Sequence, residues 1–105
     1  MAILHTRIFQ AKPGQAGPLV EHFKVAIEQM KSYGMNWDTR ISTDYYSGRS
    51  DRVKVEWVVE DLGDVDADVA KVMEIPEAAA FLGGWIEQLN NMINYSDADN
   101  WTIVE

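Results

Sequence analysis

The chain has 105 residues, of which 47% are hydrophobic, no cysteine and a formal charge of −8 at pH 7. This length builds a single domain, residues 1–105, around one core. The acidic charge argues against nucleic acid and against anionic membranes, since both require basic patches. Without cysteine, disulfides and thiolate metal sites are excluded. With neither a membrane-spanning apolar run nor a signal-peptide pattern in the sequence, we expect a cytoplasmic protein.

The first predicted strand runs from Ile3 to Gln10. The segment 12–17 ends it, and Pro18 stands in the first turn of a helix predicted over 18–33, which Gly34 ends. Apolar residues recur at helical spacing along this segment, namely Leu19, Phe23, Ala26, Ile27 and Met30. Alternation along the strand puts two sets on opposite sides, Leu4, Thr6 and Ile8 against His5, Arg7 and Phe9.

A long β-hairpin is predicted next, with arms 36–46 and 52–60 around the loop 47–51. The two apolar rows share a face if the numbers of paired residues add up to an even value. A five-residue loop gives pairs whose numbers add up to 98: Ile41 with Trp57, Thr43 with Val55, and Asp44 with Lys54. The apolar rows are Trp37, Thr39, Ile41, Thr43 and Tyr45 in the first arm and Val53, Val55, Trp57 and Val59 in the second.

The remaining segment predicts a short helix, a longer helix and a final strand. Asp61 or Asp64 can cap the short helix, which runs through Val65 to Met73. Pro76 opens the longer helix, in which Gly83 and Gly84 each cost roughly 1 kcal/mol relative to alanine. Compensation is expected from close approach of another backbone or from a bend beside a pocket. The polar segment 95–100 is predicted to be a break before a final strand over 101–105.

This order predicts an α+β domain of the ferredoxin-like β-α-β-β-α-β type, with a four-stranded antiparallel sheet covered by helices on one face. We expect the helices to cover Thr6 with the apolar hairpin row. The other face is then expected to carry His5, Arg7, Phe9, Arg40, Ser42, Glu56 and Val58. Because that face mixes apolar and charged groups, we expect a second copy to cover it about a two-fold axis.

Over nearly its whole length the chain resembles the dimeric α/β-barrel superfamily. Four segments carry the resemblance: HTRIF (5–9), the hairpin YYSGRSDRVKVEWVVEDL (45–62), IPEAAAFLGGW (75–85) and WTIVE (101–105). This superfamily includes antibiotic-biosynthesis-type monooxygenases, small haem-degrading monooxygenases, stress-responsive barrel proteins and NIPSNAP-like proteins. The resemblance implies a homodimer in which two sheets form a barrel, with each site between sheet and helices.

The haem-degrading branch combines a first-strand Asn, a third-strand Trp and a helix His. In this chain Thr6 stands at about the Asn position and Trp57 matches the Trp, but no histidine follows His22. The resemblance therefore does not extend to haem degradation. No phosphate-binding loop is present either, so we expect no cofactor and no metal.

Two groups of candidate site residues follow. A small apolar or aromatic ligand is the expected partner of the first group, and a subunit interface or polar cavity is expected for the second. The ligand group is Thr6, His22, Phe23, Thr39, Trp57 and Trp85; the polar group is His5, Arg7, Arg40 and Glu56. For each residue, ordinary packing or cross-strand pairing is the competing interpretation.

Three functions stay open at this point. The preferred one is a homodimer that binds a small apolar or aromatic molecule. The second is a cofactor-independent monooxygenase of the antibiotic-biosynthesis type, and the third is a structural or regulatory dimer with a filled core. Fold alone does not choose among them, and no catalytic residue can be assigned.

Overall fold

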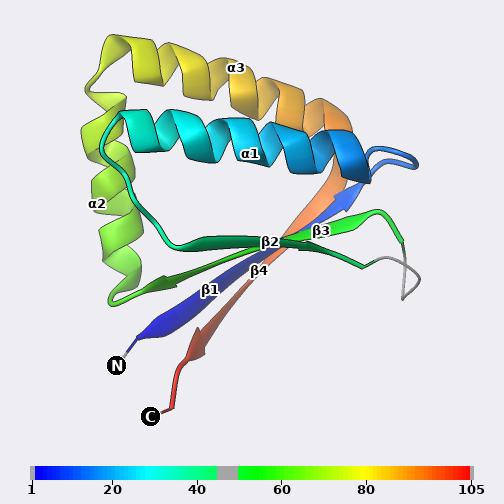
Figure 1. The fold of residues 1–105 in the computed structure, drawn as a ribbon, viewed down its shortest axis with the longest axis horizontal. Coiled ribbons are helices and arrows are strands. Elements are labelled where there is room, and N and C mark those ends of the chain that lie inside the picture. Colours follow the sequence, from blue (N-terminus) through cyan, green and yellow to red (C-terminus); the bar gives the residue numbers. More distant parts are fainter. Residues whose placement is uncertain (1, 45–49, 105) are drawn as a thin grey trace.

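The computed structural model describes residues 2–44 and 50–104, and these form one antiparallel sheet with helices on one side of it (Figure 1). The order of the strands across the sheet is β2-β3-β1-β4. The elements are β1 (Ile3–Ala11), α1 (Ala16–Ser32), β2 (Thr39–Thr43), β3 (Arg52–Val59), α2 (Leu62–Met73), α3 (Pro76–Met92) and β4 (Ile93–Thr102). The prediction of a ferredoxin-like α+β fold with a four-stranded sheet is confirmed.

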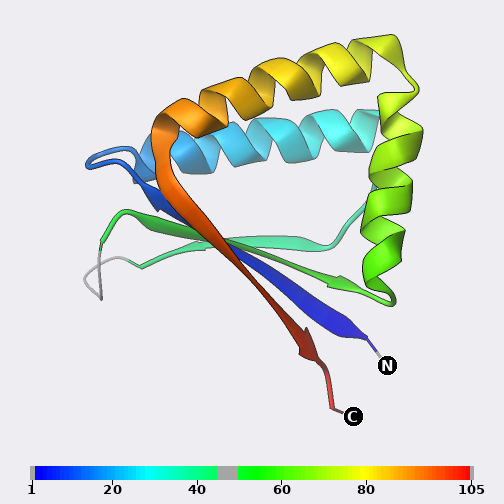
Figure 2. The same ribbon diagram turned by 180° about the vertical axis from the view of Figure 1, so that it is seen from behind.

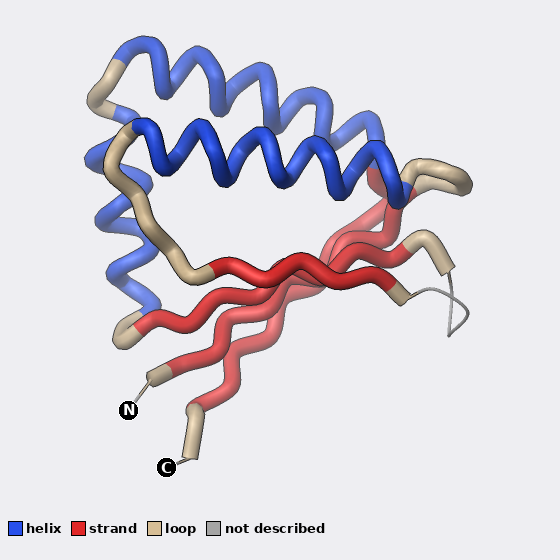
Figure 3. Tube along the Cα trace, viewed as in Figure 1, coloured by secondary structure: helices blue, strands red, loops and turns tan. Residues whose placement is uncertain are grey.

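The helices form a layer whose distance from the sheet increases from one end to the other. α1 and α3 lie side by side over the sheet, and Figure 2 shows the same arrangement from behind. At one end the two helices come down onto the sheet. At the other end they stand away from it, and α2 fills the side between the sheet and the start of α3 (Figure 3). None of the helices among the described residues combines the length and apolar content of a membrane span.

Local sequence signals account for the helix ends. Gly34 adopts a φ of 92°, a left-handed conformation that stops α1 and favours glycine. Of the two predicted caps for α2, the structure selects Asp61, whose carboxylate accepts a hydrogen bond from the Gly63 backbone N–H at 2.7 Å. Pro76 begins α3 as predicted, and the helix continues through both internal glycines to Met92.

The prediction for the sides of β1 is wrong. β1 pairs with β3 so that His5 lies opposite Trp57 and Phe9 opposite Val53. Directly paired residues share a face, so the odd-numbered residues of β1 face the helices. We call this the helix face and the opposite side the outer face. Thr6, opposite Glu56, lies on the outer face. Alternation alone left the choice open because each side of β1 carries two large apolar residues or more.

The prediction for the hairpin faces is confirmed, but its register is shifted by two residues. Ile41 pairs with Val55 rather than Trp57, and Thr43 pairs with Val53. A shift of two keeps every side chain on its predicted face. The predicted strand residues 45 and 46 lie outside the described part, and β2 begins only at Thr39, after a segment without regular structure.

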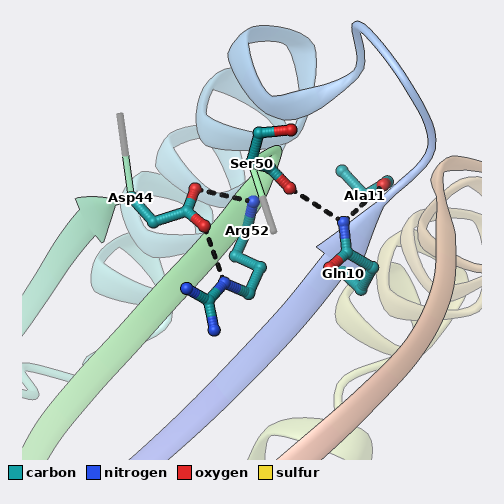
Figure 4. A network of polar contacts seen from close by, with 5 residues as sticks. All are labelled: Gln10, Ala11, Asp44, Ser50 and Arg52. Carbon is teal, nitrogen blue, oxygen red and sulfur yellow. Dashed lines mark hydrogen bonds and ion pairs between the residues drawn. The ribbon is translucent and has the colours of Figure 1, made fainter. Parts of the chain in front are cut away.

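Polar contacts at the end of the hairpin explain the shift (Figure 4). The Asp44 carboxylate accepts hydrogen bonds from the Arg52 backbone N–H at 3.0 Å and from Arg52 Nε at 2.6 Å. Gln10 Nε2 donates to the backbone carbonyls of Ser50, at 3.0 Å, and Ala11. These contacts hold Asp44 beside Arg52, whereas the predicted register would place it beside Lys54.

The polar segment 95–100, predicted as a break, belongs to β4. This strand starts directly after α3 and pairs with β1 from Ile93 to Thr102. Backbone hydrogen bonds to β1 require no apolar side chains, and charged residues suit an exposed edge strand. The predicted start of the last strand is therefore wrong; of its residues 101–104 only Trp101 and Thr102 lie in β4, and residue 105 lies outside the described part.

A reciprocal contact joins α1 to α3. Trp85 Nε1 donates to the His22 carbonyl at 2.8 Å, and His22 Nε2 donates to the Trp85 carbonyl at 2.8 Å. The two rings stack with centroids 4.6 Å apart and planes 3° from parallel. Because a carbonyl only accepts, His22 carries its proton on Nε2. Two hydrogen bonds and a ring stack thus fix the separation of the helices at this point.

The Asp44–Arg52 pair predicts a pH dependence. The hydrogen bond from the Arg52 side chain lowers the pKa of Asp44 below its ordinary value of 3.8. A lowered folded-state pKa gives stability that is complete above the unfolded-state pKa and is lost as pH falls through the folded-state value. In chemical denaturation from pH 6 to pH 2, Asp44→Asn should therefore lose less stability on acidification than the wild type. Asp97→Asn, on the edge strand, is the control; an unchanged slope for Asp44→Asn would contradict the role of the pair.

The His22–Trp85 contact predicts a second stability effect. His22→Phe keeps a ring for stacking but removes the hydrogen bond that His22 Nε2 donates to the Trp85 carbonyl. The free energy of unfolding should fall by roughly 0.5–1.5 kcal/mol. Glu21→Ala removes only an exposed ion pair with Lys24 and should change it by less than about 0.5 kcal/mol. Equal effects of the two variants in urea denaturation would show that the contact does not hold the helices.

Candidate functional site

An apolar cavity of about 450 Å³ lies between the helix face of the sheet and the three helices. Its wall contains no titratable side chain. The lining residues are Phe23, Ala26, Ile27 and Met30 of α1, Met35 and Trp37 of the following segment, Thr39, Val55 and Trp57 of the sheet, Val69 and Met73 of α2, and Ala79, Leu82, Gly83, Trp85 and Ile86 of α3. An engineered apolar cavity of about 150 Å³ can bind benzene, so this one has room for a larger molecule.

Two matching helix stripes create the space. α1 contributes positions 23, 26, 27 and 30, and α3 contributes 79, 82, 83 and 86. Both follow the i, i+3, i+4, i+7 spacing of one helix face. Ala26 and Gly83 stand at the middle of these stripes and Ala79 begins the second one, and all three are too small to fill the distance that α2 imposes. The cavity therefore results from small residues at positions where a filled core requires large ones.

The hydrophobic core is divided into two clusters of buried residues, and the cavity lies between them. One cluster, around Phe9, Leu19, Phe23 and Val53, lies where the helices meet the sheet. The other consists of Met30, Met35, Val72 and Ala78, where α1, α2 and α3 meet. Phe23 belongs to the first cluster and Met30 to the second, and both line the cavity. Each end is thus closely packed while the centre stays open.

An aromatic row crosses the sheet along one side of the cavity. Trp57 stacks with Trp37, with ring centroids 6.2 Å apart, and its other neighbour is His5, with centroids at 4.7 Å and the rings at 65°. Trp37 Nε1 donates to the Asp68 carboxylate of α2 at 3.1 Å. At the far end, His5 Nδ1 donates to Asn100 Oδ1 of β4 at 2.5 Å. Hydrogen bonds at both ends therefore hold the row in place.

The six candidate ligand residues do not all lie at the cavity. The structure places Phe23, Thr39, Trp57 and Trp85 on its wall. Thr6 lies on the outer face, because β1 has the opposite orientation to the one predicted. His22 lies behind the wall, where it is stacked on Trp85. The sequence marked His22 as a residue that reaches the ligand, whereas the structure places it against Trp85, from where it supports the wall.

The four candidate polar residues are divided between the two faces of the sheet. Arg40 and Glu56 are paired neighbours on the outer face, as predicted. His5 and Arg7 lie instead on the helix face, opposite Trp57 and Val55. The Arg7 guanidinium carbon is 5.7 Å from the centre of the Phe9 ring, and its Nε is buried without a hydrogen-bond partner in the described part of the chain. The four residues therefore do not form one polar cavity.

Sequence reasoning missed the contribution of α2 and of the segment that precedes β2. Met35, Val69 and Met73 line the cavity, and their positions depend on where α2 stands. The small residues Ala26, Ala79 and Gly83 were a usable signal, since they interrupt otherwise bulky apolar stripes. Within residues 2–44 and 50–104, no group of three histidine, aspartate or glutamate side chains is placed to hold a metal ion.

Neither a protein-family model nor a curated protein matches the sequence. Solved structures do match. A NIPSNAP family protein from Agrobacterium tumefaciens has a TM-score of 0.74 at 18% identity, covering 100% of this chain and 95% of that one. An uncharacterised NIPSNAP domain protein from Burkholderia xenovorans has a TM-score of 0.74 at 11% identity, covering 97% and 94%. A candidate antibiotic biosynthesis monooxygenase from Chloroflexus aurantiacus has a TM-score of 0.67 at 13% identity, covering 100% and 95%.

These identities are low, so the likeness concerns the fold and carries no activity over to this chain. It agrees with the resemblance that the sequence indicated. The chain has the ferredoxin-like α+β fold of the NIPSNAP and antibiotic-biosynthesis-monooxygenase-like proteins.

Proposed function

We propose that the protein binds a small apolar or aromatic molecule in the cavity between sheet and helices. The observation that carries this proposal is the size and chemistry of the wall: about 450 Å³ lined almost entirely by carbon and sulfur atoms from sixteen residues. Apolar wall left open to water forgoes the stabilisation that close packing of the same helices brings. A bound ligand supplies the missing contacts.

The two adjacent glycines of α3 support a binding role over a filled core. A Cβ added at Gly83 or Gly84 meets no other atom within 4 Å, so neither glycine is required by close approach of another segment. Of the two, only Gly83 lines the cavity. Each glycine lowers helix stability relative to alanine, and open space for a ligand gives the one at position 83 a function.

The wall favours binding over acid–base catalysis. A monooxygenase without a cofactor still needs groups that accept or donate protons at the reacting atoms. None of the sixteen lining residues is titratable. His5 is separated from the cavity by Trp57, against which its ring packs. We therefore place the monooxygenase function, which the similarity to the Chloroflexus protein suggests, behind ligand binding.

We further propose that the protein is a homodimer that buries the outer face. Val58 and Trp101, both beside Leu4 on this face, are 45% and 64% exposed. Arg40 lies toward the β2 edge of the face, and Asp97 and Asp99 lie on β4 at the opposite edge. A two-fold axis through the middle would bring the basic side of one copy to the acidic side of the other.

Ligand binding is tested with the paired variants Gly83→Leu and Gly84→Leu. Both replace a helix glycine and should raise the free energy of unfolding by roughly 0.5–1 kcal/mol. The Gly83→Leu side chain should also occupy the cavity and abolish the binding of naphthalene measured by isothermal titration calorimetry. Gly84→Leu should keep it. If the wild type binds no apolar compound, or if both variants bind equally, the cavity is not the binding site.

Dimerisation is tested by sedimentation equilibrium. The wild type should have about twice the chain mass of 11.9 kDa at micromolar concentration. Val58→Glu puts a charge on the outer face and should give a monomer, whereas Val25→Glu, on the exposed side of α1, should stay dimeric. A monomeric wild type would overturn this part of the proposal without affecting the cavity.

A further inference from the structure

We infer that the cavity selects a hydrocarbon ring system with no polar group on its enclosed part. This inference rests on the proposed function and names the class of ligand. Four polar side-chain groups belong to the wall residues: the indole N–H groups of Trp37, Trp57 and Trp85, and the hydroxyl of Thr39. The question is which of them a ligand can reach.

Two indole N–H groups are already engaged with the protein. Trp85 Nε1 donates to the His22 carbonyl at 2.8 Å, and Trp37 Nε1 donates to Asp68 at 3.1 Å. The third, Trp57 Nε1, is buried and has no partner among the described residues, so protein atoms cover it. A ligand could reach it only by displacing the ring. None of the three is thus available as a donor in the cavity.

The hydroxyl of Thr39 is engaged as well. It donates to the Trp37 carbonyl at 3.3 Å, which directs its proton toward the backbone. The glycine on the wall adds no free backbone group, because Gly83 lies inside α3, where helical hydrogen bonds use its N–H and C=O. The Thr39 oxygen can still accept one hydrogen bond, but the wall side chains offer no free donor. A carbonyl or ether of an enclosed ligand would therefore lose its water without gaining a partner, and a second hydroxyl or amine would do the same, which is unfavourable.

The remaining wall atoms favour rings. The aromatic rings of Phe23, Trp57 and Trp85 offer edges and faces for offset or perpendicular stacking. The thioethers of Met30 and Met35 are polarisable and adapt to a flat ring. These groups surround the same space from different elements. An aromatic hydrocarbon thus gains favourable contacts on several sides.

A polar substituent is tolerated only at the mouth. Met73 of α2 and Ile86 of α3 line the cavity and are nevertheless 46% and 49% exposed, which places the opening between these two helices. A ring with a polar group at one end can direct that group outward through the opening. If a ring carries polar groups at opposite ends, one of these groups has to lie in the enclosed part of the cavity.

The experiment compares naphthalene, 1-naphthol and 1,5-dihydroxynaphthalene by isothermal titration calorimetry on the wild-type protein. The diol carries hydroxyls at opposite ends of the same ring system, so one hydroxyl must be enclosed. We expect naphthalene to bind at least about tenfold more tightly than the diol, with 1-naphthol between them. Equal affinities of naphthalene and the diol, both abolished in Gly83→Leu, would overturn the selectivity but keep the cavity as binding site.

Thr39→Val provides the second measurement, because it removes the hydroxyl and keeps the shape of the side chain. We expect the affinities for naphthalene and for the diol to stay within about twofold of the wild type. A loss of affinity for the diol alone would show that Thr39 is a polar anchor and would overturn the inference. If none of the three compounds binds to the wild type, the proposed function and the inference fail together.

Discussion

The structure depends on a fixed separation between α1 and α3. At one end of the cavity, the stack and the two hydrogen bonds between His22 and Trp85 hold the helices together. At the other end, Met30 and Ala78 pack with Val72 of α2. Between these points Ala26, Ala79 and Gly83 are too small to fill the space whose width the two contacts set. The cavity is a consequence of two firm contacts with small residues between them.

The two faces of the sheet differ in their surroundings. Phe9, Val53 and Val55 of the helix face belong to the packed core, and Trp57 on the same face lines the cavity. The outer face carries a mixture of apolar, polar and charged residues and has no helix over it (Figure 3). Since strand residues alternate between the faces, one sheet can form a ligand site on one side and a subunit contact on the other.

Polar groups stabilise the cavity from behind its wall. The hydrogen bonds of Trp37 to Asp68 and of Trp85 to His22 turn polar atoms away from the space and leave the ring surfaces toward it. Each tryptophan therefore serves as a hydrogen-bonded support on one edge and as apolar wall on its faces. The wall therefore includes four polar side-chain groups, yet neither of these two indole N–H groups is free to donate to a ligand.

The sequence by itself determined the fold class and most of the elements, but not the extent of β4. Helical spacing in 18–33 predicted α1, the proline at 76 predicted the start of α3, and the alternation of 52–60 predicted β3. These patterns succeeded because each depends only on residues that are neighbours in the chain. The parity argument for the hairpin correctly placed Val55 and Trp57 on one face, because a register shift of two residues leaves the faces unchanged.

Tertiary structure decided the remainder. The side of β1 that faces the helices follows from its pairing with β3, and both sides of β1 were apolar enough for either choice. The register of the hairpin follows from the contact between Asp44 and Arg52. Strand β4 forms through backbone hydrogen bonds to β1, and these bonds do not depend on whether the side chains are polar. The cavity needs two helix stripes, α2 and the sheet at once. No local pattern contains the distance between them, because long-range packing sets it.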